Sequence, residues 1–304
     1  MKEIACALCG NTQPSRLFRP PRAPGPVVRC QHCGLVYVSP LEQDQAIITA
    51  PVLGQKDPAI LTSADTRLLN GFWELAQLPK RQGERPALRR NATAALRRLE
   101  RYVRPPGRLL DFGCGWGFFL ATARERGWEV YGLEPLPGHA LYARAMVGAT
   151  VTTDVLHDDT FPADHFDVIT AFQVLEHLPD PAGNLHRLHR CLRPGGLILI
   201  EVPNIATWSV TLLGKRHRHF NPDHLTFFSP RTLRALLEKY GLEVLETYRP
   251  TRWMTLRYLF GHWGRWLLGR PPAPTRVGHT SWLQRLVVPL NFGDIVGAIG
   301  RKQT

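Results

Sequence analysis

The stretch Arg108-Leu-Leu-Asp-Phe-Gly-Cys-Gly-Trp-Gly-Phe-Phe-Leu-Ala-Thr-Ala-Arg124 joins an apolar run to a glycine-spaced turn and an amphipathic segment. This pattern predicts a strand, a tight turn and a helix. Gly113, Gly115 and Gly117 permit positive φ angles and let a ligand approach the backbone, because no Cβ atoms stand in the way. Asp111 ends the strand, where a carboxylate faces the crevice at the carboxyl end of a parallel sheet. The stretch therefore predicts an α/β fold with a cofactor at this turn.

A second acid follows the next predicted strand. Residues 128–133 form that strand, and Glu134 comes directly after it. An acid at this place can accept hydrogen bonds from both hydroxyls of a ribose, which S-adenosylmethionine (SAM) and NAD both contain. The dinucleotide fingerprint needs a glycine at its sixth place, and Phe118 occupies that place. The spacing of the turn therefore argues against a dinucleotide.

The D-x-G-x-G-x-G spacing from Asp111 to Gly117 resembles motif I of the class I SAM-dependent methyltransferases. A predicted fourth strand at 166–172 is followed by three further motifs, Glu176-His-Leu, Pro194-Gly-Gly and Val202-Pro-Asn. In this order the motifs resemble the small-molecule branch of the family, including sugar and polysaccharide-cluster methyltransferases. The resemblance covers 109–204 and implies a Rossmann-like sheet of seven strands, the last of them antiparallel.

The resemblance also implies SAM as the cofactor. The residues expected to hold it lie in motif I and at the ends of the second, third and fourth strands: Asp111, Gly113, Cys114, Gly115, Gly117, Glu134, Asp154, Val155 and Gln173. Asp154 and Val155 come at the end of the predicted third strand, 147–153, near the expected position of the adenine. An acid there can accept a hydrogen bond from the exocyclic amine, or it can cap a helix.

Two histidines are candidates for a general base. In SAM the sulfonium already activates the methyl group, so the protein mainly has to align the acceptor and remove a proton. His177 follows the fourth strand, and His224 lies in the segment Asn221-Pro-Asp-His. Histidine can take a proton near neutral pH. The alternative for both residues is a structural hydrogen-bonding role.

Glu176, His177 and His224 also resemble part of the Mg²⁺ site of the small-RNA 2′-O-methyltransferases. Gln173 stands where that family has another carboxylate. Because Mg²⁺ prefers several oxygen ligands, we do not expect magnesium at this place.

Four of the six cysteines form two knuckles, Cys6-x-x-Cys9 and Cys30-x-x-Cys33. This spacing predicts a four-cysteine zinc ribbon at 1–40, in which a structural Zn²⁺ supplies folding free energy. Disulfides are the alternative, and a reducing compartment disfavours them.

Other residues near these cysteines have simpler expected roles. His32 is expected to be exposed, because four sulfurs already close the tetrahedron around a zinc ion. The proline-rich segment between the knuckles is expected to be a loop, and 35–38 a strand. Cys114 and Cys191 lie far from the knuckles and are expected to pack in the core.

The predicted zinc ribbon is followed by a helical linker and cofactor lid at 41–106. One helix of this segment, at 86–103, has apolar residues at helical spacing, namely Leu88, Ala92, Ala95, Leu99 and Tyr102. The SAM-binding core follows at 107–250. It includes predicted helices at 182–192 and 231–240, a turn at 193–196, and strands at 197–202 and 242–247.

The last two predicted segments are an insertion at 251–290 and the final strand with its tail at 291–304, the strand at 294–300. The insertion combines tryptophans with arginines. This combination suits a membrane interface, where aromatic rings lie at headgroup level, or a helical cap over the substrate pocket.

Composition limits the class of protein. With 304 residues, 44% of them hydrophobic, the chain can bury one large core and carry a small appendage. The formal net charge of +13 favours an anionic partner, which is a nucleic acid, an acidic lipid or a phosphorylated substrate. No apolar run approaches the roughly 20 residues that span a bilayer, and no signal-peptide core is present at the start. A cytoplasmic location is expected, and peripheral membrane contact through 251–290 is one of the two alternatives for that segment.

The expected function is SAM-dependent methyl transfer to a small-molecule or sugar/glycan-type acceptor. Certain ribosomal-RNA guanine methyltransferases also carry an N-terminal zinc domain, and the basic charge favours RNA. Against RNA, the sequence Phe172-Gln173 lacks the Asn-Pro-Pro-aromatic motif of amino-methylating nucleic-acid enzymes. A protein that only senses SAM and binds an anionic partner is the third alternative. The sequence predicts no oligomeric state.

Overall fold

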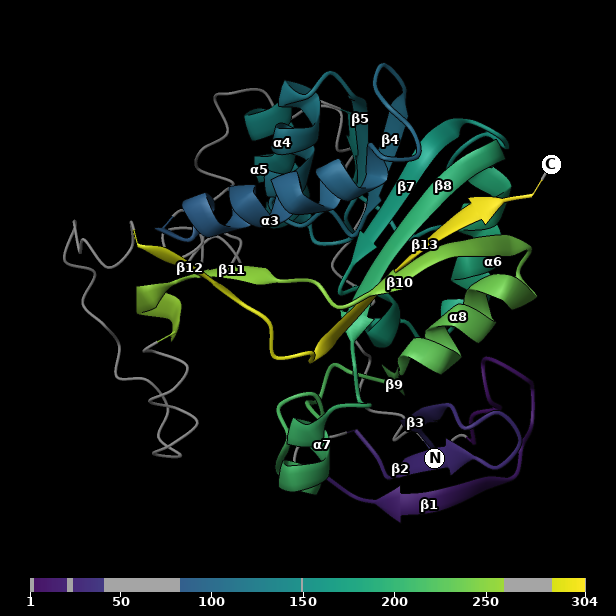
Figure 1. The fold of residues 1–304 in the computed structure, drawn as a ribbon. Helices are drawn as coiled ribbons and strands as arrows, with labels where there is room; N and C mark the ends of the chain where they lie inside the picture. Colours follow the sequence, from purple (N-terminus) through teal and green to yellow (C-terminus); the bar gives the residue numbers. More distant parts are fainter. Residues whose placement is uncertain (1–2, 21–23, 41–82, 149, 260–285, 304) are drawn as a thin grey trace.

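A seven-stranded mixed sheet forms the centre of the molecule (Figure 1). The computed structural model describes residues 3–20, 24–40, 83–148, 150–259 and 286–303. The strands, in their order across the sheet, are β10 (Leu242–Tyr248), β13 (Ile295–Lys302), β8 (Leu192–Pro203), β7 (Phe166–Phe172), β4 (Arg108–Phe112), β5 (Glu129–Leu133) and β6 (Thr150–Thr152). Only β13 is antiparallel to its neighbours, β8 and β10. This arrangement confirms the predicted seven-stranded sheet with an antiparallel last strand.

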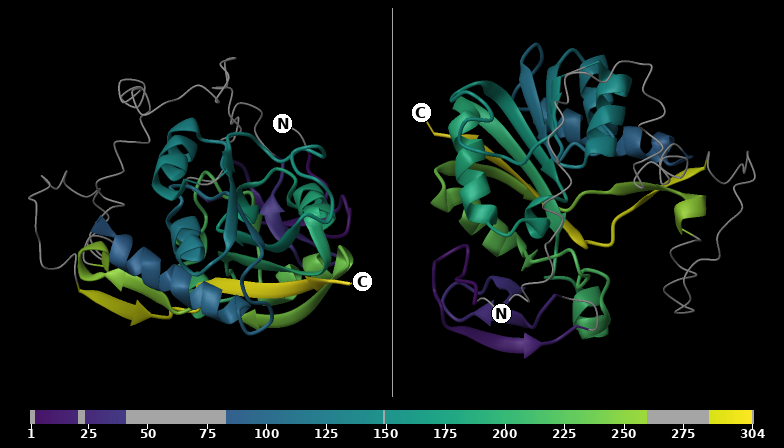
Figure 2. Two further views of the ribbon diagram at one scale, coloured as in Figure 1. Left: turned by 90° about the horizontal axis from the view of Figure 1, so that it is seen from above. Right: turned by 180° about the vertical axis from the view of Figure 1, so that it is seen from behind.

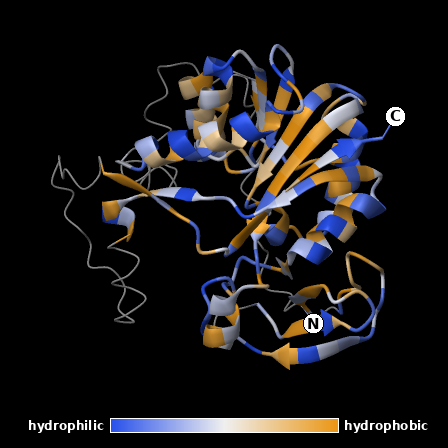
Figure 3. Cartoon of the chain, in the orientation of Figure 1, coloured by the Kyte–Doolittle hydropathy of each residue, from blue (hydrophilic) through white to orange (hydrophobic). Residues whose placement is uncertain are grey.

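Helices cover both faces of the sheet. One face carries α3 (Arg85–Leu99), α4 (Phe118–Glu125) and α5 (Pro137–Val147), and the other carries α6 (Pro181–Cys191) and α8 (Pro230–Lys239). Along β8, Leu197 and Leu199 face the first group, whereas Ile198 and Ile200 face the second. A parallel strand buried on both faces is mostly apolar, and the central strands are mainly orange in Figure 3.

The structure corrects several predicted boundaries. The third strand contains only Thr150–Thr152, not 147–153. The turn expected at 193–196 lies within β8. The register of β8 against β7 shifts here, because Phe166 pairs with Leu192 but Val168 pairs with Leu197. Gly195 has φ +74°, so the glycines form an irregularity in the strand and do not end it.

Helix α3 packs on the sheet as part of its cover. Ala95, Leu96 and Leu99 share a buried cluster with residues of β4, β5, β7 and β8. Tyr102, expected in the buried face, is exposed and lies beyond the end of the helix. Of the predicted linker and lid, 41–82 lies outside the described residues.

The cysteine-containing segment forms a second sheet. Its strands are β1 (Pro14–Phe18), β2 (Val27–Cys30), β3 (Val36–Val38) and β9 (Thr226–Phe227), in that order. The expected loop between the knuckles therefore contains two strands. Because β9 comes from the segment after β8, the sheet joins the first 40 residues to the domain of the seven-stranded sheet.

The ends of the predicted helical insertion are strands. β11 (Arg252–Thr255) pairs with β12 (Val287–Leu290), and this pair extends alongside α3 (Figure 2). Asn91 of α3 hydrogen bonds to both the N–H and the carbonyl of Trp253. The middle of the segment, 260–285, lies outside the described residues. Among the helices that the structure describes, none is long and apolar enough to cross a membrane.

Three short elements complete the description. They are the 3-10 turns η3 (Leu175–His177) and η4 (Gly214–Arg216) and the helix α7 (Trp208–Leu213). η3 follows β7 directly, and α7 follows β8, so both lie at the carboxyl edge of the parallel strands. In open α/β sheets, ligands bind at this edge.

Candidate active site

The three glycines between β4 and α4 have positive φ angles, +75° at Gly113, +52° at Gly115 and +74° at Gly117. A Cβ at Gly113 would lie 2.5 Å from Val174 Cγ2, and one at Gly117 would lie 2.9 Å from Ala143 Cβ. A Cβ at Gly115 would meet nothing within 4 Å. Packing therefore requires Gly113 and Gly117, whereas Gly115 faces open space where a flat ligand can reach the backbone.

Glu134, at the carboxyl end of β5, is bonded to this turn. Its Oε2 accepts a hydrogen bond from the Gly115 N–H at 2.8 Å, and its Oε1 accepts one from the Leu136 N–H at 3.0 Å. The residue is buried. The structure thus brings together motif I and the acid after the second strand, which are 19 residues apart in the sequence.

Asp111 is buried beneath the turn, at the end of β4. Its Oδ1 accepts a hydrogen bond from the Thr170 hydroxyl at 2.7 Å. Burial raises the pKa of Asp111 to about 7; the Thr170 hydrogen bond lowers it, and the negative charge of Glu134 raises it further. The carboxyl group therefore keeps its proton to a higher pH than a free aspartate does.

The other predicted cofactor residues, Asp154 and Gln173, make hydrogen bonds outside the glycine turn. Asp154 Oδ1 accepts a hydrogen bond from the Val155 N–H at 2.7 Å and lies 3.6 Å from His157 Nε2. Gln173 has φ +56°, and its side-chain amide donates to the Glu201 carbonyl at 3.1 Å. The Gln173 amide is thus engaged by β8.

The two cysteines outside the knuckles are buried, as expected for packing residues. Cys114 belongs to the apolar cluster that α4 and α5 form with the sheet, and its N–H donates to the Leu133 carbonyl at 3.2 Å. Its backbone belongs to the turn, while its thiol is part of the core.

Sequence reasoning missed three residues beside the glycine turn. Trp116 is buried, and its ring centroid lies 4.1 Å from that of His139 and 5.5 Å from that of Tyr142. Thr170 lies directly opposite Asp111 in the pairing of β4 with β7. Thr170 could have been found from the sequence, because it lies near the end of the strand that neighbours motif I in this fold. For Trp116 and His139, nothing in the sequence distinguished a site residue from a core residue.

Glu176, His177 and His224 form a cluster at the carboxyl edge of β7. The ring centroids of the two histidines are 4.7 Å apart, and His177 Nε2 lies 3.9 Å from Glu176 Oε1. One potential ligand atom from each residue lies within 4.8 Å of the others. The structure therefore brings the two predicted bases together with a buried acid.

The protonation of this cluster differs from that of free side chains. Burial raises the pKa of Glu176 to about 8. Burial lowers the pKa of His177, and burial together with the neighbouring His177 lowers that of His224 to about 3. His224 is consequently a much weaker base than the sequence predicted.

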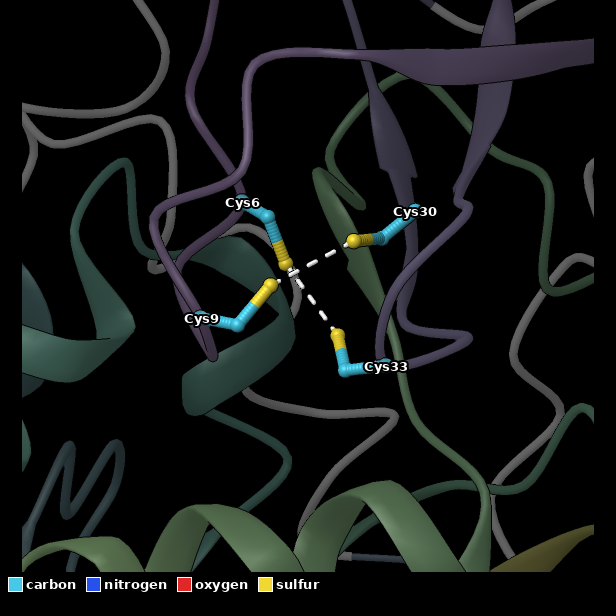
Figure 4. A group of neighbouring side chains, drawn as sticks. All are labelled: Cys6, Cys9, Cys30 and Cys33. Atoms are coloured by element: carbon cyan, nitrogen blue, oxygen red, sulfur yellow. Dashed lines mark hydrogen bonds between the residues drawn. The ribbon is translucent and has the colours of Figure 1, made fainter.

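The four knuckle cysteines converge on one point (Figure 4). The Sγ atoms of Cys6 and Cys33 are 3.4 Å apart, as are those of Cys9 and Cys30. Sulfurs that are each about 2.3 Å from a shared zinc ion lie about 3.8 Å from one another. All described cysteines are free thiols, and disulfide sulfurs would be about 2.05 Å apart. The cluster fits a zinc ribbon.

A cavity of about 320 Å³ lies beyond the carboxyl end of β8. Apolar side chains form most of its wall, and polar groups come from Ser209, His217 and the ion pair between Arg218 and Asp294. The apolar side chains are Trp208, Leu213, Met254, Tyr258, Leu259 and Phe292. This composition suits a small molecule with an apolar part.

The geometry of the turn and its acids agrees with a comparison to known families. A family model described as a methyltransferase domain matches residues 84–247, more than half of the chain. The chain belongs to the methyltransferase-domain family. The matched range includes the glycine turn, Glu134 and the cluster at Glu176.

Among curated relatives, the ubiquinone biosynthesis O-methyltransferase of Aeromonas salmonicida is 32% identical over 151 residues, which cover 45% of this chain and 63% of that enzyme. The chain thus spans less than two thirds of that relative. A solved complex of the Haloferax volcanii Trm112 methyltransferase activator with a methyltransferase matches at 22% identity and a TM-score of 0.48, covering 69% of this chain and 89% of that chain. Phosphoethanolamine N-methyltransferase 2 of Haemonchus contortus, solved with SAM, matches at 18% identity and a TM-score of 0.46. The match covers 70% of this chain and 53% of that chain.

The buried Asp111 predicts a pH dependence of stability. Between about pH 4, where an unfolded aspartate titrates, and pH 7, the folded protein holds a proton that the unfolded chain has released, so stability falls as pH rises. The Asp111→Asn variant keeps the acceptor for Thr170 and lacks this titration. Its free energy of unfolding should exceed that of the wild type by about 1 to 3 kcal/mol at pH 8, with little difference at pH 4. Urea unfolding of the ligand-free protein at several pH values measures this.

Asp159→Asn is the matched control, because Asp159 is exposed. Its stability relative to the wild type should not change with pH. A difference for Asp111→Asn that is the same at every pH would contradict a raised pKa.

Proposed function

We propose that this chain transfers the methyl group of SAM, bound at the glycine turn, to a small-molecule or sugar/glycan-type acceptor. The observation that carries the proposal is the open space at Gly115 beside Glu134, whose carboxylate is fixed by two backbone N–H groups. SAM supplies an activated methyl group, so the chain has to bind the cofactor and orient the acceptor.

The residues at the turn fit such a cofactor. Glu134 already accepts one backbone hydrogen bond at each oxygen, and each oxygen retains a second lone pair for a ribose hydroxyl. Gly115 leaves room for the ligand next to the backbone. Asp154, after β6, is partly exposed and retains an oxygen that can accept from an adenine amine. We assign these three positions to cofactor binding, with Asp111 beneath them.

The cavity beyond β8 supports a small-molecule acceptor with an apolar part. Ligands of this fold bind at the carboxyl edge of the sheet, and the cavity lies at that edge. The Arg218–Asp294 ion pair and His217 provide polar groups for the remainder of the acceptor. A lipid-linked or aromatic-ring acceptor and an apolar glycan precursor share this chemistry.

The distribution of charge supports a small molecule over RNA. Arg98 and Arg101 both bind Glu246, and Arg126 binds Glu100. Arg98 also stacks 3.8 Å from the ring centroid of Tyr248. Some of the arginines around α3 are therefore paired within the protein, which leaves fewer cations for phosphates.

We infer that the knuckle cysteines bind a structural zinc ion. Four thiols converge without an open coordination position, which is the arrangement of structural sites. The zinc ribbon, defined as residues 3–40 of the described chain, buries Cys6 and Cys30 in one apolar cluster with Leu233 and Leu236 of α8. The zinc ion would thus stabilise the core as well as the ribbon.

Replacing Glu134 by Gln tests the cofactor site. Both oxygens accept from backbone N–H groups, so a glutamine must point its own NH₂ group at one of these donors. Affinity for SAM should fall by about 1 to 3 kcal/mol, roughly 5- to 150-fold, in titration calorimetry. Glu129→Gln, an exposed position on the same strand, should bind SAM like the wild type. Equal affinities for both variants would refute the assignment of Glu134.

Two neighbouring leucines of α7 test the acceptor site. Leu213 lines the cavity, whereas Leu212 is 70% exposed and does not. The acceptor is first identified by incubating methyl-labelled SAM and the protein with fractionated extract, which should label a small-molecule fraction that nuclease does not remove. With the acceptor from that fraction, Leu213→Glu should lower kcat/KM at least about 10-fold, because it places a charge against an apolar ligand. Leu212→Glu should leave it unchanged, and label found in nuclease-sensitive material would favour RNA.

Removing one zinc ligand tests the ribbon. In Cys30→Ser the bound zinc should fall from about one per chain to near zero, as measured by atomic emission. Because the ribbon and α8 share a buried cluster, the whole chain should unfold at a lower temperature. His32→Ala is the matched control inside the same knuckle, since His32 is exposed. Full zinc content in Cys30→Ser would contradict the proposed site.

A further inference from the structure

Glu176 is a buried acid without an evident partner. Its relative exposure is 1%, and neither carboxylate oxygen has a hydrogen-bond partner among the residues that the structure describes. An unsatisfied buried carboxylate is costly, so a group of this kind calls for a ligand or a function. The acids of the glycine turn differ in this respect, since Asp111 and Glu134 both accept hydrogen bonds.

The two histidines beside Glu176 are held with a free nitrogen each. His177 Nδ1 lies 2.8 Å from the Asp223 carbonyl, so Nδ1 carries the proton and Nε2 is left as an acceptor. His224 is 8% exposed and is hydrogen bonded to the His219 backbone. Its Nδ1 is buried and has no partner within the described part of the chain. Carbonyls thus fix both tautomers, as they do for metal-binding histidines.

We propose that Glu176, His177 and His224 bind a divalent transition-metal ion of the Mn²⁺, Fe²⁺ or Co²⁺ type. Two separate chain segments, η3 and the loop before β9, bring one carboxylate oxygen and two imidazole nitrogens within 4.8 Å of one another. Ligand atoms of one ion lie about 3 to 4 Å apart, and the 3.9 Å between His177 Nε2 and Glu176 Oε1 agrees with this.

The set of ligand atoms selects the class of cation. Two imidazoles suit a first-row transition ion, whereas Mg²⁺ prefers oxygen ligands throughout. Three protein ligands also leave coordination positions open, and the His177 side chain is 37% exposed, so solvent or a ligand can reach the ion.

The site lies close to the glycine turn. Val174, the residue before η3, lies so near Gly113 that a Cβ there would come within 2.5 Å of it. An ion at this place could hold and acidify an acceptor hydroxyl, which would replace a histidine base. This catalytic role rests on the proposed function; binding of the ion does not.

Binding of Mn²⁺ tests the proposal without measuring methyl transfer. The full chain is first loaded with one equivalent of zinc, which the four thiolates take up and retain against Mn²⁺, and excess zinc is removed so that it does not occupy the second site. Titration followed by electron paramagnetic resonance should then show about one bound Mn²⁺ per chain. Glu176→Gln and His224→Asn should each weaken binding at least about 10-fold. His186→Gln removes an exposed histidine from α6 and should bind like the wild type.

The outcomes separate this site from the proposed function. SAM affinity and the unfolding temperature are measured for each variant, so that a loss of Mn²⁺ binding with SAM affinity retained assigns the ion to Glu176 and His224. The proposal is overturned if neither Mn²⁺ nor Co²⁺ binds to the zinc-loaded chain at millimolar concentration, or if both site variants bind like the wild type. Glu176 would then be a protonated acid beside His224, and the SAM site would be unaffected.

Discussion

Two backbone hydrogen bonds at Leu225 connect the parts of this protein. The Leu225 N–H donates to the Glu176 carbonyl at 2.7 Å, and the Leu225 carbonyl accepts from the Val38 N–H at 2.9 Å. Through this one residue the last strand of the ribbon is joined to the turn that follows β7. His224, next in the chain, is placed against Glu176 as a consequence. The geometry of the cluster therefore depends on a ribbon that is almost 200 residues away in the sequence.

Buried side chains at β9 also join the ribbon to the core of the sheet. Phe227 and Phe228, in and after β9, are fully buried, but they belong to different clusters: Phe227 packs with Val36 of the ribbon and Phe228 with the core. Alternate residues of a strand point to opposite sides, so a single short strand contributes to both. The ribbon and the sheet thus share one continuous interior. A cysteine cluster in such a position acts on the site through the backbone it fixes, not through direct contact with the cofactor.

Sequence periodicity predicted the sheet well, because its strands are apolar on both faces and are followed by turn residues. Phe166–Phe172 has the predicted bounds, and Asp111 and Glu134 lie at the ends of their strands. The pairing of β3 with β9 could not be predicted, since β9 has two residues and its partner is distant in the sequence. For the same reason Glu176 and His224 were singled out only through motif order, and their missing hydrogen-bond partners became visible in three dimensions.

Electrostatics connects the buried acids to the kind of ligand that the turn accepts. Asp111 has one hydroxyl partner and lies near the negative charge of Glu134, so in the empty site its ionised form is poorly stabilised. SAM carries a sulfonium and an ammonium group, and a cation near these acids favours the ionised form of Asp111. The proposed cofactor and the two acids of the turn are therefore complementary in charge as well as in shape.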